Sequence, residues 1–390
     1  MKIAEGVIYV GVNDYKIDLF EGMYHVPDGI AYNSYVIMDE KIAVIDTVDA
    51  EFTKEWLKNI RKALGGRKPD YLIIQHMEPD HSANIMNLVK FFPEIILVSS
   101  AKAFGMMQHF FGTEFAEKRI VMSDGDIFSL GRHKLKFIEA PMIHWPEVIM
   151  IYDETEKLLF SADAFGKFGT VDCARQTEDI TADWAPEAAR YYFGIVGKYG
   201  VYVQKLLNKV GALKIEQICP LHGPIIRENL REYVKLYDTW SSYQPEKAGV
   251  VIAYTSVYGN TKRAVELLAE KLRITGCKVV VHDLARCDMM EAVADAFRYD
   301  RIVLATTTYN AEIFPFMREF ISHLTERNFS NRKVAFVENG GWAPIAAKII
   351  REKLEKCKDI EFVEPVVRIL SVVSEENLKQ MDMLVKEIQR

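Results

Sequence analysis

Two histidines and two carboxylates stand within six consecutive residues, directly after an apolar run. They are His76, Glu78, Asp80 and His81, and the run Tyr71–Ile74 that precedes them is typical of a buried strand. On an extended or turning backbone this spacing directs the side chains apart, whereas a helix would align residues at steps of three or four. A solvated polar loop is the simpler alternative. So many metal-binding side chains in so short a stretch nevertheless favour a metal site.

Three further candidate ligands follow other apolar runs. They are His144 after residues 134–139, Asp163 after residues 158–160, and His222 after residues 215–219. Each of them alone is more simply explained as a turn or capping residue. Together with the first group they share one topological position, the carboxyl end of a strand, where ligands gather in sheets of this kind. We therefore expect all these side chains to lie close together.

So many nitrogen and oxygen donors exceed what one transition-metal ion binds, so they indicate two ions that share a ligand. Asp163 is the expected bridge, because each of its carboxylate oxygens can bind one ion. We expect His76, Glu78 and His144 to bind one ion, and Asp80, His81 and His222 to bind the other. All of them are therefore candidate catalytic residues. Imidazole and carboxylate without thiolate suit iron, manganese or zinc, and Glu78 favours iron over a hydrolytic zinc pair.

A second group of candidate residues lies in the second half, where a phosphate would bind at the first strand-to-helix turn. This turn has small hydroxyl side chains around one glycine, without Gly-x-Gly-x-x-Gly or Walker spacing. It consists of Thr255, Ser256, Val257, Tyr258, Gly259, Asn260 and Thr261. Two later loops place small residues beside an aromatic ring: Thr307, Thr308, Tyr309, Asn310 and Ala311, and Asn339, Gly340, Gly341, Trp342 and Ala343. Helix capping and ordinary packing are the alternatives for each loop alone. Together the loops favour FMN, whose monophosphate and flat ring they would hold.

The periodicity of apolar residues predicts two domains of different architecture. Residues 1–244 combine β-meanders with βα units and helices, which predicts an α+β fold of two packed sheets with helices outside. A polar linker follows near Ser241–Lys247. Residues 249–390 then alternate strands and helices, which predicts an α/β fold with an open, doubly wound, five-stranded parallel sheet.

Composition limits the classes of partner and compartment. The 390 residues have a formal net charge of −6, which provides no basic surface for nucleic acid. No run approaches the roughly 20 apolar residues of a membrane span, and the first residues lack the apolar stretch of a signal peptide. The 5 cysteines are scattered without a Cys-x-x-Cys pair, which argues against disulfides, a zinc ribbon and a rubredoxin-type iron site. We expect a cytoplasmic protein with reduced thiols.

With both halves considered, the sequence resembles the flavodiiron proteins, also called A-type flavoproteins, over essentially its whole length. The motif His76-x-Glu78-x-Asp80-His81 together with His144, Asp163 and His222 matches the diiron ligands of that family, and the three loops are similar to its FMN site. The resemblance implies a metallo-β-lactamase-like αββα domain followed by a flavodoxin-like domain. It also implies reduction of O2 to water or of NO to N2O, with rubredoxin, another small carrier or reduced deazaflavin as electron donor. A head-to-tail homodimer, possibly a tetramer, is implied as well.

Several features leave alternatives open. The same ligands suit a dinuclear zinc hydrolase of the metallo-β-lactamase type, and the chain is also compatible with an electron-carrying flavoprotein that reduces no gas. Where several flavodiiron proteins carry a histidine near the metals, this sequence places Glu21. Trp145, Tyr191 and Tyr192 are candidates to surround the ligands. No rubredoxin or flavin-reductase segment follows Arg390 in the sequence, so the resemblance implies the two-domain form.

Overall fold

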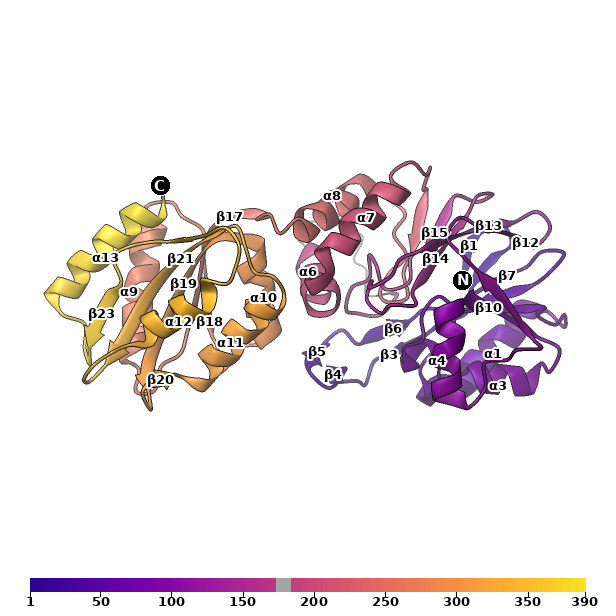
Figure 1. Cartoon of the computed structure of the whole chain (residues 1–390), viewed down its shortest axis with the longest axis horizontal. Coiled ribbons are helices and arrows are strands. Elements are labelled where there is room, and N and C mark those ends of the chain that lie inside the picture. Colours follow the sequence, from indigo (N-terminus) through magenta and orange to yellow (C-terminus); the bar gives the residue numbers. More distant parts are fainter. Residues whose placement is uncertain (173–183) are drawn as a thin grey trace. The chain divides into compact units, whose positions relative to one another are not determined.

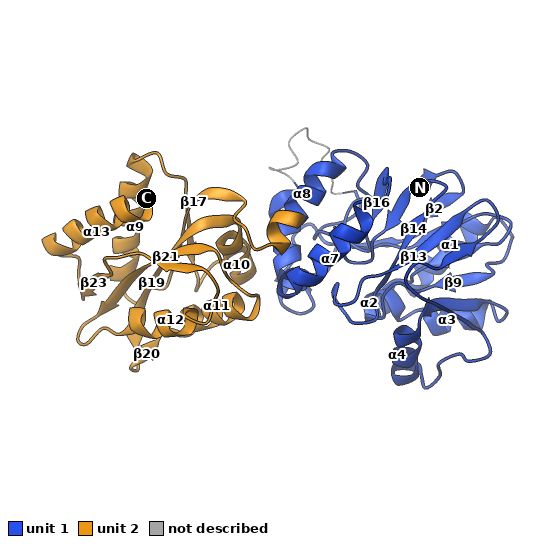
Figure 2. Cartoon of the chain, turned by 45° about the horizontal axis from the view of Figure 1, so that its top comes forward, with its two compact units in different colours: residues 1–237 blue, residues 238–390 orange. Residues whose placement is uncertain are grey.

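The apolar runs of the first half form two large sheets, and those of the second half form a third. The computed structural model describes residues 1–172 and 184–390, which divide into two units, residues 1–237 and 238–390 (Figures 1 and 2). The sequence predicts a boundary between residues 244 and 249, whereas the division lies within helix α8 (Leu230–Ser241). The end of this helix belongs to the second unit because Trp240 Nε1 donates to Glu246 at 3.0 Å.

The first unit contains a seven-stranded and a five-stranded sheet. The seven-stranded sheet consists, in spatial order, of β1 (Lys2–Ala4), β2 (Val7–Tyr9), β7 (Tyr35–Ile37), β8 (Ala43–Ile45), β9 (Tyr71–Ile73), β10 (Ile96–Ser100) and β11 (Arg119–Met122). The five-stranded sheet consists of β12 (Ile127–Ser129), β13 (Lys134–Glu139), β14 (Ile149–Asp153), β15 (Leu158–Phe160) and β16 (Gln217–Cys219). Two short antiparallel pairs lie apart from them, β3 (Val12–Asp14) with β6 (Ile30–Tyr32) and β4 (Leu19–Phe20) with β5 (Tyr24–His25).

Helices lie outside these two sheets, with α1, α3 and α4 beside the seven-stranded sheet in Figure 1. The described helices are η1 (Ala50–Phe52), α1 (Thr53–Leu64), α2 (Pro79–Ser82), α3 (Ile85–Phe91), α4 (Ala101–Phe111), α6 (Ala185–Tyr191), η2 (Tyr192–Val196), η3 (Gly197–Tyr199), α7 (Gly200–Val210) and α8. Helix α1 ends at Gly65, whose φ of +55° is the left-handed conformation expected of a glycine stop.

The main core of the first unit lies between the two sheets. Tyr35 and Ile73 of the seven-stranded sheet and Phe137 and Phe160 of the five-stranded sheet are fully buried in one cluster. The Tyr35 and Phe160 rings meet edge to face at 5.1 Å. Burying apolar side chains from both inner faces stabilises the sandwich and leaves the strand ends to carry polar loops.

The second unit is built on one largely parallel sheet. Its strands are, in spatial order, β18 (Val279–Asp283), β17 (Lys247–Tyr254), β19 (Tyr299–Tyr309) and β21 (Arg332–Gly340), and then both β22 (Ile360–Phe362) and β23 (Val367–Leu370). The last predicted strand corresponds to β23, whereas the sequence does not predict β22, which pairs with an earlier part of β21. A short strand that the sequence does not predict, β20 (Glu312–Ile313), pairs antiparallel with β19. The order matches the doubly wound arrangement in which a ligand binds beyond the carboxyl ends of the strands.

Helices cover both faces of this sheet (Figure 1). They are α9 (Asn260–Ile274), α10 (Met289–Arg298), α11 (Pro315–Glu326), α12 (Ala346–Leu354) and α13 (Glu375–Ile388). On one face, Leu268 of α9 and Leu384 of α13 pack with Val250, Val303 and Val337 from the strands, and all these residues are buried. The predicted alternation of strands and helices is confirmed.

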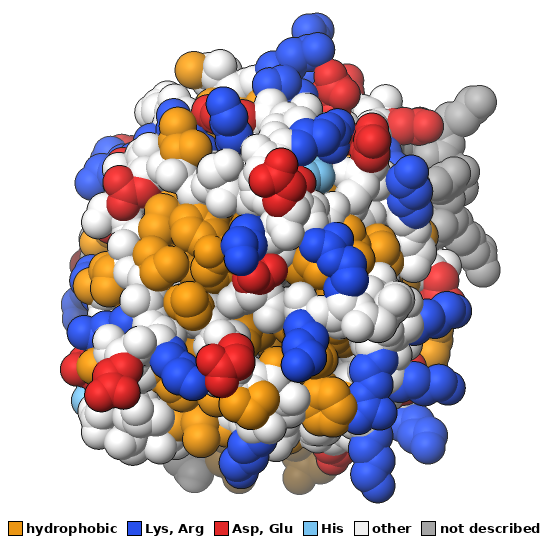
Figure 3. Space-filling view, turned by 90° about the vertical axis from the view of Figure 1, so that its right-hand side faces the viewer, with side chains coloured by type: hydrophobic (Ala, Val, Ile, Leu, Met, Phe, Trp, Pro, Cys, Tyr) orange, Lys and Arg blue, Asp and Glu red, His pale blue; other side chains and the backbone are white. Residues whose placement is uncertain are grey.

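The surface is of mixed character. On the face shown in Figure 3, hydrophobic groups reach the surface between lysine, arginine and acidic side chains. None of the helices in residues 1–172 and 184–390 combines the length and the apolar composition that crossing a bilayer requires. Cys219, Cys277, Cys287 and Cys357 are free thiols, and Cys173 lies outside the described residues.

Candidate metal centre

The seven predicted metal ligands converge in the first unit as two adjoining groups. One consists of His76, Glu78, His144 and Asp163, and the other of Asp80, His81 and His222. They come from the segments that follow β9, β13, β15 and β16. The carboxyl ends of these strands therefore meet, as the shared position of the residues in the sequence predicts. Glu78 and His144 are half-buried, and the other five are buried.

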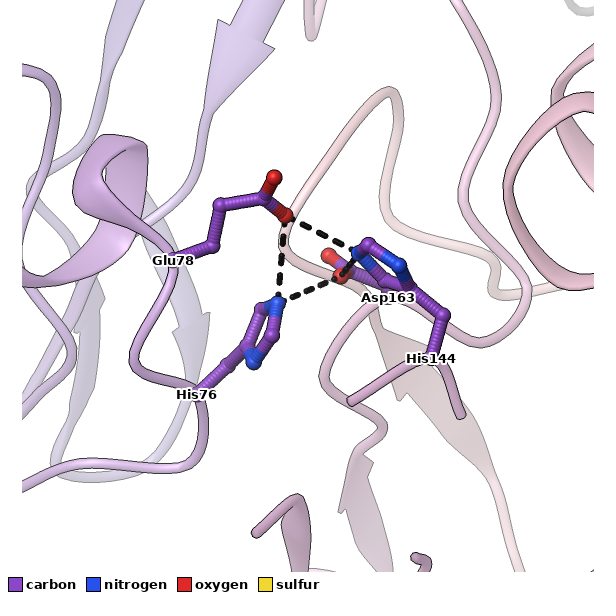
Figure 4. Close-up of side chains that lie close together, drawn as sticks. All are labelled: His76, Glu78, His144 and Asp163. Carbon is purple, nitrogen blue, oxygen red and sulfur yellow. Dashed lines mark hydrogen bonds and ion pairs between the residues drawn. The ribbon is translucent and has the colours of Figure 1, made fainter. Parts of the chain in front are cut away.

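In the first group, four donor atoms face a common point (Figure 4). Glu78 Oε2 lies 3.2 Å from His76 Nε2 and 2.9 Å from His144 Nε2. Asp163 Oδ2 lies 3.2 Å from His76 Nε2 and 3.3 Å from His144 Nε2. The Nε2 atom of each imidazole thus lies close to one oxygen of Glu78 and one oxygen of Asp163.

The second group has the same character. His81 Nε2 and His222 Nε2 face each other at 2.9 Å, and each lies 3.3 Å from Asp80 Oδ2. Asp80 and His81 belong to the single helical turn α2, which begins at Pro79. Only His76 and Glu78 therefore lie on extended or turning backbone. Asp80 and His81 lie in a helical turn, which Pro79 can begin because proline is readily accepted in the first turn of a helix.

Asp163 stands between the two groups. Its Oδ2 faces His76 and His144, whereas its Oδ1 lies 3.6 Å from both His81 Nε2 and His222 Nε2. The two oxygens of this one carboxylate thus face different groups of histidines. That is the placement a bridging carboxylate requires.

The donor atoms fit a pair of metal ions. Both oxygens of Asp163 and of Asp80 are buried without a hydrogen-bond partner, which is costly for charged groups. Two imidazole nitrogens that face each other at 2.9 Å share at most one proton. Ligand atoms bound to one ion at about 2.1 Å lie roughly 3 Å apart, which matches the spacing within each group. Metal ions would satisfy all of these atoms at once.

Hydrogen bonds from outside the two groups orient the imidazoles. His76 Nδ1 donates to Glu147 Oε1 at 2.8 Å, and the backbone N–H of Met77 donates to the same oxygen at 2.9 Å. His222 Nδ1 donates to the carbonyl of Ala31 at 2.8 Å. Both bonds leave the Nε2 atom directed at the centre, which is how proteins fix the tautomer of a metal-binding histidine.

Glu147 is a functional residue that the sequence analysis missed. Its side chain is fully buried, and Ser100 Oγ donates to its backbone carbonyl at 2.9 Å. In the sequence, the only indication of a role for Glu147 is that it is an acidic residue in the same loop as His144. Acidic residues are common in loops, so the contact with His76 could be found only from the packing of the loop after β13 against the loop after β9.

The carboxylates of this centre favour the protonated, positively charged form of the histidines in the first group. Burial opposes the charged form of His76, but the negative charge of Asp163 and the hydrogen bonds that His76 donates to Glu147 and Glu78 raise its pKa well above the usual value. Burial lowers the pKa of His144, but the neighbouring carboxylates of Asp163 and Glu78 raise it to about 9. Burial lowers the pKa of His81 to about 4. Metal binding to the first group would therefore release protons, whereas His81 is already neutral at pH 7.

The residues expected to surround the ligands differ in position. The Trp145 ring lies 5.2 Å from the ring of His76, and the buried Tyr191 ring lies 5.8 Å from that of His222. Tyr192 packs instead against Tyr237, at 5.1 Å between ring centres.

Glu21 stands in the tight turn between β4 and β5, next to Phe20. The Phe20 ring lies 5.2 Å from that of His222. Partial burial and the negative charge of Glu78 raise the pKa of Glu21 to about 7. The acidic residue expected in place of a histidine therefore does lie within electrostatic reach of the candidate ligands.

The predicted phosphate turn of the second unit joins β17 to α9. Gly259, with φ of +89°, precedes the helix, and Ser256 Oγ accepts from the N–H groups of Gly259 at 3.1 Å and Lys262 at 3.2 Å. Thr255 Oγ1 shares a hydrogen bond of 2.6 Å with Thr306 Oγ1. Because Thr306 belongs to β19, this bond ties the turn to the start of the second predicted loop.

The other two loops reach the same sheet edge. Asn339 Nδ2 donates to Thr261 Oγ1 at 3.4 Å, which joins the third loop to the phosphate turn. Thr307 Oγ1 is buried without a partner, whereas Thr308 Oγ1 accepts from two N–H groups at the start of α12. The Thr308 hydroxyl thus holds the first residues of α12 in place, and its contact with FMN stays a prediction.

Three aromatic rings project from these loops into solvent. Tyr258 is 93% exposed, Trp342 85% and Tyr309 45%. Such exposure is unusual for large rings, and it suits the stacking of a flat ligand. The same three segments contain the remaining residues that were predicted to contact FMN. They are Val257, Asn260, Asn310, Ala311, Gly340, Gly341 and Ala343.

Comparisons with known proteins find relatives of both units. The family model described as ODP family beta lactamase matches residues 30–223, and the model described as Flavodoxin domain matches residues 251–365. The nitric oxide reductase of Moorella thermoacetica is 29% identical over 97% of this chain and 95% of its own. These matches confirm the predicted metallo-β-lactamase-like and flavodoxin-like domains.

Solved structures show the same similarity. The rubredoxin oxygen:oxidoreductase of the anaerobe Desulfovibrio gigas has a TM-score of 0.92 at 27% identity, over 100% of this chain and 97% of that one. The flavodiiron protein of Giardia intestinalis has a TM-score of 0.88 at 25% identity, over 99% of this chain and 95% of that one. The likeness therefore extends through both units.

Proposed function

The chain belongs to the flavodiiron proteins, and from that premise we propose that it reduces O2 to water, NO to N2O, or both, at a non-haem diiron site supplied with electrons through FMN. The observation that carries this proposal is the position of Asp163. Each of its unpartnered oxygens faces a different group of histidines. The chain is accordingly an oxidoreductase, with two iron ions and FMN as its cofactors.

We assign the ligands from the geometry of the two groups. His76, Glu78 and His144 would hold one iron, and Asp80, His81 and His222 the other, with Asp163 shared between them. When bound, the irons and FMN supply the electrons that the reduction consumes.

The chain's own residues hold the ligands in place and shield one side of the centre. Glu147 keeps the Nε2 atom of His76 directed inward, and the carbonyl of Ala31 does the same for His222. The rings of Phe20, Tyr32 and Tyr191 lie within 5.9 Å of the His222 ring. This aromatic wall excludes water from the second group and lowers the local dielectric constant, which strengthens electrostatic interactions there.

In the second unit we propose that the turn from Thr255 to Thr261 holds the phosphate of FMN. Backbone N–H groups at the start of α9 favour an anion there. The unpartnered hydroxyl of Thr307 supports the placement of a polar ligand atom beside it. Trp342 and Tyr309 are proposed to stack on the flavin ring, because both rings are available to solvent.

The partners follow from the same chemistry. We propose a rubredoxin-type donor, with another small carrier or reduced deazaflavin as alternatives, and a cytoplasmic location. A head-to-tail homodimer, alone or as half of a tetramer, would place the flavin of one subunit near the metals of another. Sedimentation of the purified protein measures the size of the assembly.

The decisive experiment follows the oxidation of the fully reduced protein by O2 and by NO in parallel, using anaerobic stopped flow. We expect rapid oxidation by at least one gas and loss of gas consumption in His81→Asn, with FMN retained. His109→Asn, a change at an exposed histidine of the same unit, is the matched control. Unchanged gas consumption in His81→Asn would indicate an electron carrier. A purified protein with zinc in place of iron would indicate a hydrolase.

A further inference from the structure

The strand β21 forms an ion pair with a neighbouring strand near each of its ends. Near its start, Lys333 lies opposite Glu361 of β22, with the charged atoms 3.0 Å apart. Near its end, Glu338 lies opposite Arg368 of β23, and Arg368 Nε donates to Glu338 Oε1 at 2.7 Å. The side chain of Glu361 is 63% exposed, whereas that of Glu338 is only 1% exposed. An exposed pair contributes little to stability, but a buried carboxylate is costly unless its oxygens have partners.

The second oxygen of Glu338 binds the start of a helix. Its Oε2 accepts from the backbone N–H of Ala347, in the first turn of α12, at 3.0 Å. Glu338 directly precedes the third predicted flavin loop, residues 339–343, and Ala347 follows this loop. Thr308 of β19 accepts from the two N–H groups before Ala347. The Glu338 side chain therefore joins the segments on both sides of the loop.

The backbone of this loop needs support from its surroundings. Ala343 has φ of +39° and Ser371, beyond the end of β23, has φ of +68°, a region that residues with a side chain rarely adopt. The Ser371 N–H donates to the Gly340 carbonyl at 3.3 Å, so the two segments lie together. The exposed Trp342 ring provides no packing that would hold the loop. Such backbone persists only where the surrounding structure fixes it, and the contacts of Glu338 on both sides of the loop do so.

We propose that Glu338 is a positioning residue of the flavin site, which fixes residues 339–343 in the conformation that binds FMN. This role rests on the FMN site proposed above, and Glu338 is not one of the residues predicted to contact the cofactor. Glu338 acts through the backbone of the loop, while Arg368 keeps its carboxylate in place. A preformed loop favours binding, because it loses less conformational freedom when the cofactor binds.

Another buried ion pair of the same unit provides a comparison. His282 Nε2 of β18 donates to Asp295 Oδ2 of α10 at 2.9 Å, and both side chains are largely buried. Burial lowers the pKa of His282, but the hydrogen bond to Asp295 raises it to about 9. This pair also joins a strand to a helix, but β18 and β23 lie at opposite edges of the sheet. Removing it should destabilise the unit without changing the third loop.

The test dilutes the FMN-loaded full-length protein and measures the fluorescence of released FMN, which gives the dissociation constant. We expect an increase of about tenfold in Glu338→Ala, because this variant loses both hydrogen bonds of a buried charged group. Glu338→Gln keeps an acceptor for the Ala347 N–H and should stay within about threefold of the wild type. Glu361→Ala, at the exposed pair of the same strand, should bind FMN as the wild type does. The circular dichroism of the bound flavin should change only in Glu338→Ala.

Asp295→Asn separates positioning from a general loss of stability. This variant should unfold at a lower urea concentration than the wild type and still bind FMN with unchanged affinity. An affinity in Glu338→Ala equal to that of the wild type, or an equal loss in Asp295→Asn, would overturn the role of Glu338. Absence of FMN from the wild-type protein would instead overturn the flavin site itself, and this role with it.

The partner of Glu338 provides a second test, which decides the question even if Glu338→Ala does not fold. Arg368→Gln leaves the buried carboxylate without its cation and should weaken FMN binding. The double variant Arg368→Gln with Glu338→Gln removes both charges and should regain most of the affinity. If Arg368→Gln bound FMN as the wild type does, or if the double variant regained nothing, the charge of Glu338 would not position the loop.

Discussion

The candidate metal centre and the three loops proposed to hold flavin both lie at the carboxyl ends of strands, but they are built in different ways. At the candidate metal centre, buried and half-buried side chains that follow strands of two sheets supply the donor atoms. In the flavin loops, backbone N–H groups and small hydroxyls form the turn, and the large rings are exposed. The first site therefore depends on the identity of each side chain. The second depends mainly on the backbone path, which tolerates more substitution.

The substitution Asp163→Ala should have the largest effect, and it tests whether the metal centre depends on the identity of a single side chain. Removing the shared carboxylate should empty at least one iron position and reduce gas consumption by more than about a hundredfold, while FMN stays bound. Iron and flavin analysis together with gas consumption measures this. Asp124→Ala, at an exposed carboxylate of the same unit, should retain both irons. Retention of both irons in Asp163→Ala would refute the bridging role.

Glu147→Gln tests whether the identity of a side chain matters beyond the ligands themselves. Loss of the charge behind His76 should weaken iron binding by about 10- to 100-fold, with the fold intact. Iron titration of the metal-depleted protein measures the affinity. Glu139→Gln, at an exposed acid of strand β13, is the matched control. An unchanged affinity in Glu147→Gln would show that backbone contacts alone position His76.

The second unit has its own buried charge, and its stability should depend on pH. The pKa of His282 is about 9 in the folded protein against about 6.5 when unfolded, so its contribution is fully present below pH 6.5. It is lost as the pH rises through 9, at a cost of about 2 kcal/mol in the free energy of unfolding. Urea titrations at pH 6.5 and pH 9 measure this loss, and His282→Gln should show a smaller one. An equal loss in the variant would assign the effect to other groups.

Trp342→Ala should have the smallest effect. Stacking by one exposed ring contributes about 1 kcal/mol, so the affinity for FMN should fall by up to about tenfold and the iron content should not change. Fluorescence titration with FMN measures the affinity, and Trp342→Phe should retain most of it. A loss of more than about a hundredfold would mean that side chains dominate the flavin site as well.

Local patterns in the sequence predicted most elements and all seven candidate ligands. The strands that precede the four ligand segments agree with the apolar runs of the sequence, because each strand depends on residues a few positions apart. The short strands β20 and β22 were not predicted. Each has only two or three residues, and β22 is defined by its pairing with β21, which lies on the other side of α12 in the sequence.

The sequence by itself determined which residues can bind metal, since four histidines and three carboxylates stand after apolar runs. Only the tertiary structure decided which ligands share a point, which oxygen of Asp163 faces which group, and that Glu147 supports His76. It also decided that His282 of β18 pairs with Asp295 of α10. The physical reason is that residue type and local periodicity act within a few residues. The direction of a buried side chain is set instead by the packing of segments that lie far apart in the chain.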